Sequence, residues 1–184
     1  GAYVDLHGGT ASYAILLASD DDGSATAMLD KLESTHAYTS TQIDGVEVNA
    51  GQHSLIRQFL SGLTNQRGDE WGTDRLRFAR DVLAAVRGGL GPDRLLGLRL
   101  SCDELAPWAG ITPDQAPAIA AELAAVVDYL VVVRGAIYSA EKTRPDFHEP
   151  AGFNIEVCCA VRQAVASTSP ATAVILQGSV VDWG

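Results

Sequence analysis

Residues 55–72 read LIRQFLSGLTNQRGDEWG, and this stretch decides the fold class together with the apolar run at 45–48 before it. The apolar run is typical of a strand, and apolar residues reappear at helical spacing beyond Thr73. A buried strand, a polar loop and a helix in that order form one unit of an α/β protein. We therefore expect an α/β fold built outward from this unit.

The same order of strand and helix repeats along the chain. Apolar runs rich in Val, Ile and Leu predict strands at residues 2–6, 45–48, 95–100, 129–133 and 173–176. Because these runs do not alternate with polar residues, they are typical of parallel strands buried on both faces. Helical spacing and end signals predict helices at residues 24–40, from Thr73 or Asp74 to Leu90, at 112–126 with Pro113 at the first helical position, and at 153–166.

Two architectures satisfy this order, a (β/α) barrel and an open doubly wound sheet. No Gly-x-Gly-x-x-Gly follows any predicted strand, which weakens the case for a dinucleotide-binding sheet. Polar or small residues follow each predicted strand, where barrel enzymes build their sites. Taken alone, that second pattern is explained better by loops that begin there.

Composition narrows the functional classes. The 184 residues suit one domain, with 47% hydrophobic residues and 20% charged residues. The formal net charge of -10 repels phosphate backbones, so we expect no nucleic-acid partner. We expect no membrane partner either, because no apolar run approaches a span and no signal-peptide pattern is present.

Cysteine usage favours a cytoplasmic protein. There are three cysteines, and Cys158 and Cys159 are adjacent, which is poor geometry for a structural disulfide. A reducing cytoplasm is the simplest interpretation. No Cys/His spacing indicates zinc, so we expect no metal site.

The quoted stretch also resembles a known family. Its residues stand at the spacing of the strand-4 signature of the Old Yellow Enzyme family of flavin-dependent oxidoreductases: Gln58, Phe59, Leu60, Ser61, Asn65, Arg67, Asp69, Glu70 and Gly72. Residues 4–9, 44–48, 98–105, 128–130 and 173–178 resemble other strands of the family in the family's order. The resemblance implies a (β/α)8 TIM-barrel type fold that is partial, covering strands 3 to 7 of the family pattern. Residues 1–184 would then form a single barrel domain, incomplete at both ends.

The chain is short for such a barrel, which typically needs about 200–250 residues. Three explanations are weighed, in this order: the sequence is part of a longer polypeptide, a partner chain supplies the missing strands, or a decayed barrel closes by self-association. A homo-oligomer or a partner chain that completes the barrel is therefore expected.

A branch of the family is also indicated. Residues 133–135, 144–146, 150–154 and 177–179 are similar to the Old Yellow Enzyme-type oxidoreductases found beside mycofactocin genes in actinobacteria.

The resemblance implies flavin mononucleotide (FMN) at the C-terminal rim of the barrel. Arg99 matches the arginine that faces the flavin N1/O2 edge, and Gln177 and Gly178 would lie beside the ring or the phosphate. Asp5 stands where the family has a glutamine that pairs with the flavin ring. Its carboxylate accepts hydrogen bonds but donates none, so it suits the flavin N3–H and opposes O2 and O4.

Arg99 also has a plain alternative role. An arginine within an apolar strand needs a strong partner, and a salt bridge to Glu47 or Asp103 would provide one without any flavin.

The expected substrate-binding residues depart from the family pattern. Asn49 and Gln52 stand where the family has a histidine pair, or a histidine and an asparagine. An amide donates a hydrogen bond but transfers no proton at neutral pH. His53 follows one residue late, and a solvent-facing loop position explains it as well as a ligand-binding role does. Ser54 replaces the family's tyrosine and with it the usual proton donor.

The resemblance implies an FMN-dependent oxidoreductase. It would move hydride between NADH or NADPH and a small unsaturated or carbonyl-type substrate. The missing histidine pair argues against ordinary enone reduction and leaves demethylation or amine oxidation open. The alternative is a non-catalytic, barrel-like subunit that assembles with an active flavoprotein partner.

Overall fold

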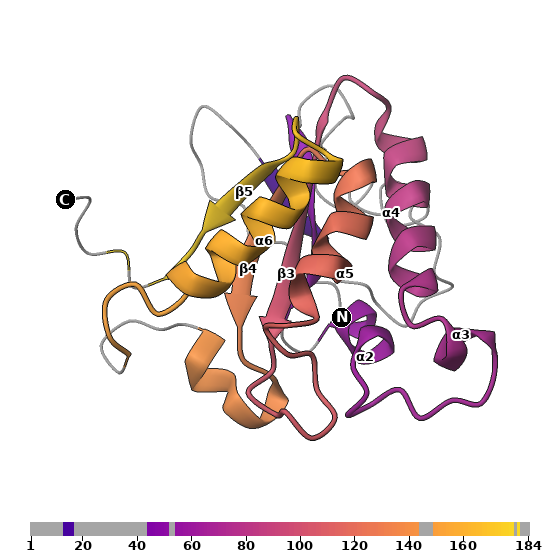
Figure 1. Cartoon of the computed structure of the whole chain (residues 1–184). Helices are drawn as coiled ribbons and strands as arrows, with labels where there is room; N and C mark the ends of the chain where they lie inside the picture. The colour runs from indigo at the N-terminus through magenta and orange to yellow at the C-terminus, as the bar shows by residue number, and fades with distance from the viewer. Residues whose placement is uncertain (1–12, 17–43, 52–53, 144–148, 179, 181–184) are drawn as a thin grey trace.

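A parallel sheet of five strands organises the chain. The computed structural model describes residues 13–16, 44–51, 54–143, 149–178 and 180. The strands are β1 (Tyr13–Leu16), β2 (Gly45–Ala50), β3 (Leu95–Asp103), β4 (Tyr129–Arg134) and β5 (Ala173–Leu176). They lie in the order β1-β2-β3-β4-β5, and each pairs in parallel with the next (Figure 1). A doubly wound sheet reverses its strand order at a switch point, whereas a barrel keeps it sequential. The described strands therefore follow the barrel order.

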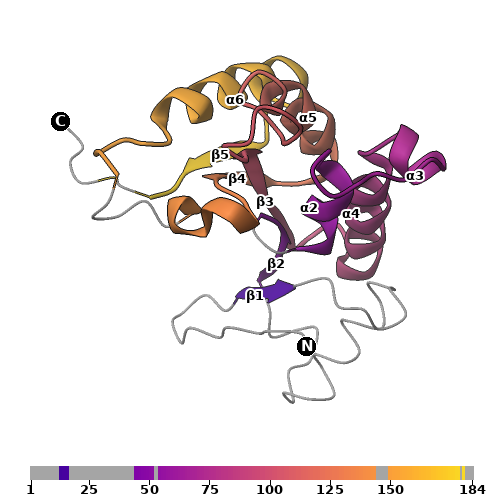
Figure 2. The same ribbon diagram turned by 90° about the horizontal axis from the view of Figure 1, so that it is seen from below.

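Helices cover one face of this sheet. The chain forms α2 (Leu55–Leu60), α3 (Glu70–Thr73), α4 (Arg77–Leu90), α5 (Ala116–Leu123) and α6 (Ile155–Thr168), with 3-10 helices η1 (Ala124–Val126) and η2 (Ile137–Thr143). Helices α4, α5 and α6 lie side by side along the sheet, and the view from below shows them on its outer side (Figure 2). The opposite face of the strands is the inner face of a barrel.

The core lies between the sheet and the helices. Alternate strand residues face the helices, among them Val46, Leu98 and Val132, each at most 1% exposed. Leu83 of α4 and Val161 of α6 pack against them and are fully buried. The apolar outer faces of β2, β3 and β4, covered by apolar helix stripes, stabilise the partial barrel because both are removed from water.

The inner face corrects one expectation. The strands β2, β3 and β4 are largely buried on both faces, as expected. The residue type on the inner face differs, however: β4 places Val131 and Val133 there, whereas β2 and β3 place Glu47, Asn49 and Arg99 there. The alternation of two residues per repeat is therefore present in β2, with apolar side chains outward and polar ones inward.

Several predicted boundaries shift. The helix expected from Thr73 or Asp74 begins at Arg77 as α4, because the Asp74 carboxylate accepts the Leu76 N–H before it. The short helix α3, which Asp69 caps, was not anticipated. The helix expected from residue 112 begins at Ala116, so Pro113 is not at its first position. Its last residues form η1.

The remaining helices also differ in part. Helix α6 covers Ile155–Thr168 where 153–166 was expected, and α2 was not anticipated as a helix. The expected strand at 2–6 and helix at 24–40 lie outside the described residues, and β1 was not anticipated.

Within the described residues no helix is both long and apolar enough to cross a bilayer. All three cysteines are free thiols, and burial raises the pKa of Cys102 and of Cys158. The cytoplasmic location stays a prediction.

Candidate functional site

Arg99 occupies the inner face in the middle of β3, beside Asn49 of β2 in the strand register. Its Nε donates to Glu47 Oε1 at 2.8 Å, and its Nη2 lies 2.8 Å from the same oxygen. Its Nη1 donates to the side-chain oxygen of Gln177, which follows β5. The structure therefore brings together two residues that the sequence predicted for one site, Arg99 and Gln177.

The salt-bridge alternative for Arg99 is realised with Glu47 and not with Asp103, since Asp103 pairs with Arg134. The Arg99 side chain nevertheless keeps 25% of its surface exposed, while Glu47 keeps 8%. A buried carboxylate therefore holds a cation whose outer part reaches solvent at the mouth of the sheet. This arrangement fits an anionic or electron-rich ligand edge, because a fixed guanidinium presents donors in one plane.

The backbone of Gln177 is held by a hydrogen bond from Asn154. Asn154, at the N-terminus of α6, donates from Nδ2 to the Gln177 carbonyl at 2.6 Å. Asn154 is 1% exposed, and its Oδ1 has no hydrogen-bond partner. Gly178 then adopts a φ of 86°, a left-handed conformation that glycine adopts without strain and that turns the chain after β5. Asn154 was missed as a site residue, and its only signal was its place within residues 150–154.

The side-chain oxygen of Asn49 accepts a hydrogen bond from its own loop. Its Oδ1 accepts the Gly51 N–H at 2.7 Å, so Nδ2, the only donor of this side chain, is the group available for a ligand. Gln52, His53 and Asp5 lie outside the described residues. Their expected roles stay predictions.

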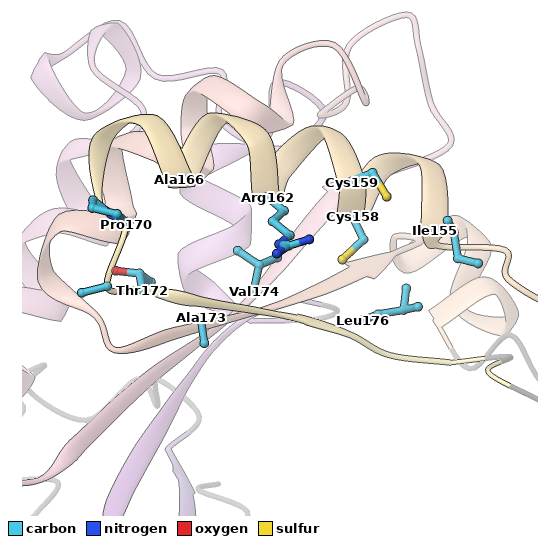
Figure 3. Close-up of a pocket in the computed structure, with 11 residues that line it drawn as sticks. Ile155, Cys158, Cys159, Arg162, Ala166, Pro170, Thr172, Ala173, Val174 and Leu176 are labelled. Carbon is cyan, nitrogen blue, oxygen red and sulfur yellow. The ribbon is translucent and has the colours of Figure 1, made fainter. Parts of the chain in front are cut away.

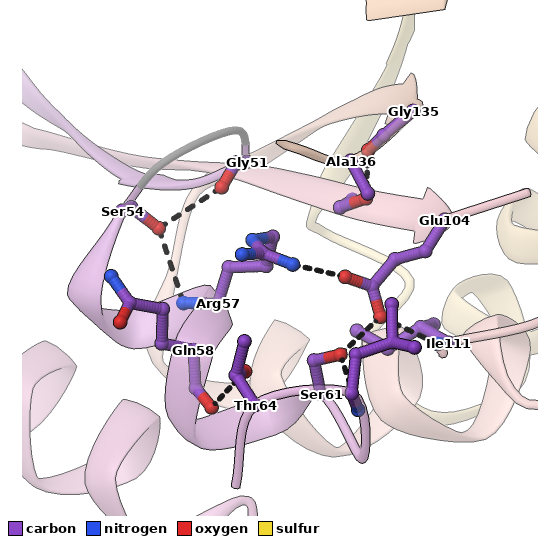
Figure 4. Close-up of polar contacts among 12 residues, drawn as sticks. Gly51, Ser54, Arg57, Gln58, Ser61, Thr64, Glu104, Ile111, Gly135 and Ala136 are labelled. Atoms are coloured by element: carbon purple, nitrogen blue, oxygen red, sulfur yellow. Dashed lines mark hydrogen bonds and ion pairs between the residues drawn. The ribbon is translucent and has the colours of Figure 1, made fainter. Parts of the chain in front are cut away.

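Ser54 has a structural role at the start of α2. Its Oγ donates to the Gly51 carbonyl at 3.1 Å and accepts the Arg57 N–H at 3.1 Å (Figure 4). This is the arrangement of a helix N-cap, and Ser54 is buried.

A second ion pair lies wholly inside the protein. Arg57 Nη1 contacts Glu104 Oε1, and the two side chains are 1% and 0% exposed (Figure 4). Glu104 Oε2 accepts from Ser61 Oγ and from the Ile111 N–H, the latter at 2.7 Å. The Glu104 carbonyl accepts from Ser139 Oγ at 3.4 Å. Glu104 thus joins the segments that follow β2, β3 and β4 at the C-terminal rim.

The residues that carry the family resemblance build a closed loop. Asn65 donates from Nδ2 to the carbonyls of Phe59 (2.7 Å) and Trp71 (2.8 Å). The Phe59 ring stacks on Phe78 of α4, and Trp71 meets both rings edge-on. This part of the signature shapes the segment between β2 and α4 and contributes no described contact to Arg99.

Two described grooves lie elsewhere. One of about 670 Å³ runs between α6 and β5, with Cys158, Arg162 and Leu176 among its lining residues (Figure 3). Another of about 570 Å³ lies between the segment that precedes α4 and the start of α5. No predicted site residue lines either groove, so the candidate site is defined by the contacts around Arg99.

Comparison with known proteins assigns the family. Residues 33–175 match the sequence profile of the NADH:flavin oxidoreductase / NADH oxidase family. The chain belongs to this family. It is 42% identical over 96 residues to the N,N-dimethylglycine/sarcosine dehydrogenase of Chromohalobacter salexigens, which covers 50% of the chain and 14% of that protein. It is 34% identical over 97 residues to the NADPH dehydrogenase of Clostridium acetobutylicum, which covers 51% of the chain and 29% of that protein.

Solved structures confirm the partial barrel. The chain resembles 2-naphthoyl-CoA reductase in complex with 2-naphthoyl-CoA, with a TM-score of 0.63 and 27% identity over 74% of the chain and 20% of that structure. It resembles morphinone reductase in complex with tetrahydroNAD, with a TM-score of 0.51 and 25% identity over 89% of the chain and 40% of that structure. The NADH:flavin oxidoreductase chain therefore matches part of each barrel.

The matched region is a small share of the curated relatives, between 14% and 29% of the two proteins named above. These comparisons do not support the mycofactocin-associated branch, which stays a prediction.

Proposed function

We propose that the protein is an FMN-dependent oxidoreductase that uses NADH or NADPH. The observation that carries this proposal is the part-exposed guanidinium of Arg99, held by Glu47 of β2 and by Gln177, which follows the C-terminal end of β5. In barrels this end carries the chemistry. Membership of the NADH:flavin oxidoreductase family supports FMN as the ligand of this cation.

Described residues fit the cofactor. Arg99 would face its electron-rich edge, while Gln177 and Gly178 would lie beside the ring or the phosphate. When bound, FMN supplies hydride transfer, taking a hydride from NADH or NADPH and passing it to the substrate, whose second hydrogen arrives as a proton. The protein's own part is to orient the two partners and to fix charge beside the ring.

Asn49 would orient the substrate, together with Gln52 and His53. The Asn49 amide donates a hydrogen bond to a carbonyl-type oxygen but delivers no proton. The proton would then come from solvent or from His53.

A second substrate class is favoured by a specific observation. Two relatives are named for amine chemistry, the N,N-dimethylglycine/sarcosine dehydrogenase at 42% identity and a probable N-methylproline demethylase of Rhizobium meliloti at 39%. An N-methylated amine needs no histidine pair to hold a carbonyl oxygen, which agrees with Asn49 in that position. For such a substrate FMN would supply the hydride acceptor, NAD⁺ or NADP⁺ would be the final oxidant, and water would hydrolyse the oxidised amine.

The test begins with the purified protein, its visible spectrum and the intact mass of the natural polypeptide. Bound FMN that is bleached by NADH or NADPH supports the reductase, and bleaching by an N-methylated amine supports the amine route. Arg99→Ala is expected to lose FMN or shift its reduction potential, and unchanged FMN behaviour would remove Arg99 from the site.

The alternative subunit role has a distinct outcome. A colourless protein that captures a second, flavin-containing chain would support it and reject the enzyme. Sedimentation of the same sample tests the predicted homo-oligomer.

A further inference from the structure

The carboxylate of Glu47 lies beneath the cation at the candidate site. We propose that Glu47 is the counter-charge and positioning residue of Arg99, and that it sets how much more tightly the site binds reduced FMN than oxidised FMN. This inference rests on the proposed function, because it concerns the same site.

The contacts define how Arg99 is held. Glu47 Oε1 lies 2.8 Å from both Nε and Nη2, so a single oxygen bridges one edge of the guanidinium. The side-chain oxygen of Gln177 accepts a hydrogen bond from Nη1, at another corner of the guanidinium. Anchors at Nε, Nη2 and Nη1 fix the plane of the group, and the long arginine stem is not free to choose another rotamer.

Burial makes the charge of Glu47 effective. Its side chain is 8% exposed, so water screens it little, whereas Arg99 is 25% exposed. Opposite charges 2.8 Å apart interact strongly in such surroundings, and the pair presents to a ligand less positive potential than a lone guanidinium would. Reduced FMN carries more negative charge than oxidised FMN. Removing the charge of Glu47 should therefore favour the reduced form.

The sheet supplies a matched control. Asp103 of β3 pairs with Arg134 of β4, with Oδ2 2.6 Å from Nη2, and these side chains are 7% and 20% exposed. The pair is thus as buried as Glu47 and Arg99, yet it has no described contact with Arg99. Asp103→Asn removes a carboxylate of equal burial without touching the proposed counter-charge.

The experiment measures FMN affinity in both redox states. The wild-type protein, Glu47→Gln and Asp103→Asn are titrated with oxidised FMN in air and with dithionite-reduced FMN without oxygen. For Glu47→Gln we expect the preference for reduced over oxidised FMN to rise about tenfold, equivalent to a positive shift of about 30 mV for a two-electron couple. For Asp103→Asn we expect a much smaller change.

A second pair of variants covers the case in which Glu47→Gln does not fold. Arg99→Gln alone leaves a buried carboxylate without a cation, while Arg99→Gln with Glu47→Gln removes both charges. The proposal predicts that the double variant prefers reduced FMN about tenfold more than Arg99→Gln does, because the charge of Glu47 acts directly on the ligand.

The outcomes separate the two proposals. A wild-type protein that binds no FMN in either state overturns the proposed function and this inference with it. FMN binding with an unchanged or reversed preference in Glu47→Gln overturns the inference alone. So does a shift of equal size in Asp103→Asn, or identical preferences in Arg99→Gln and the double variant.

Discussion

Two arginine–glutamate pairs connect β2 or the segment after it with β3 or the segment after it, and they differ in burial and in role. Arg57 and Glu104 are at most 1% exposed, and both carboxylate oxygens of Glu104 accept from donors within the protein. A quarter of the Arg99 side-chain surface is exposed to solvent. Of the two pairs, only the one with Glu47 therefore has a cation that a ligand can reach. The first pair acts on the fold, and the second is the candidate for chemistry.

At this scale we predict that Arg57→Met lowers the free energy of unfolding by about 3–5 kcal/mol, because it leaves the Glu104 carboxylate buried without its cation. Adding Glu104→Gln should recover much of that loss, since a neutral amide oxygen still accepts from Ser61 or Ile111. Urea unfolding monitored by circular dichroism gives both values.

The control is Arg67→Met. Arg67 is 52% exposed in its pair with Asp69, and water screens that pair, so its urea midpoint should stay near that of the wild type. Equal midpoints for Arg57→Met and Arg67→Met would contradict the assignment of Arg57 to a structural pair.

At the scale of elements, the segment between β2 and α4 is closed by its own side chains. Asn65 joins the carbonyl at the end of α2 to the one in α3, and the rings of Phe59, Trp71 and Phe78 pack beside it. The backbone is tight as well, since a Cβ on Gly72 would meet the Arg67 carbonyl oxygen at 1.9 Å. This is why the segment follows a strict residue spacing although it does not reach the site.

We predict that Asn65→Ala costs about 1–3 kcal/mol, because two carbonyls lose their donor in a position that is 5% exposed. Asn65→Asp should be at least as damaging, since a carboxylate has no proton to donate. The melting temperature should fall by about 2–4 °C for each kcal/mol. Gln58→Ala, at an exposed position of α2, is the matched amide control, and a melting point as low as that of Asn65→Ala would refute the role of Asn65.

At the scale of the whole molecule, the two ends of the sheet differ in task. Asp128 precedes β4 at the N-terminal end, where its carboxylate accepts from the Leu96 N–H at 2.7 Å and from Arg87 Nη2 at 2.6 Å. Its carbonyl accepts from the Ala173 N–H at 3.0 Å. Asp128 therefore links α4 with β3, β4 and β5, while Gln177, which accepts from Arg99, follows β5 at the opposite end.

The pH dependence of stability should report this link. Burial acts to raise the pKa of Asp128, but the hydrogen bonds from Leu96 and Arg87 outweigh it and hold the pKa below its usual value. Because the folded pKa is depressed, the stabilisation is complete above the unfolded pKa of about 3.9 and is lost as the pH falls through the folded value.

We therefore expect Asp128→Asn to lower the urea midpoint at pH 7 and to differ less from the wild type toward pH 3. Asp114→Asn, at an exposed turn, is the matched control variant. A difference between Asp128→Asn and the wild type that stays constant with pH would contradict the prediction. The effect is partial, because the Asp128 side chain is 42% exposed.

Much of the fold was predictable because local patterns encode it. The apolar runs at β2 to β5 and the helical spacing in α4 and α6 mark these elements without reference to partners. The start of α5 was not predictable, because Pro113 and Pro117 both suit the first turn of a helix. In the structure the helix begins at Ala116, so Pro117 is the proline in its first turn. For the site, Arg99 was recognisable as a charged residue in an apolar run, but Asn154 was not, since its contact with Gln177 spans 23 positions.

What the sequence determined by itself is the order of strands and helices, the family, and the presence of an arginine that needs a partner. Tertiary structure alone decided which partner it takes. Asn49 stands opposite Arg99 in the β2–β3 register, which brings Glu47 within reach on the same face. Between Ser101 and Asp103 the β3–β4 register shifts, and Asp103 then pairs with Arg134. Register and an irregularity in a strand depend on the neighbouring strand, so no local pattern distinguishes the two carboxylates.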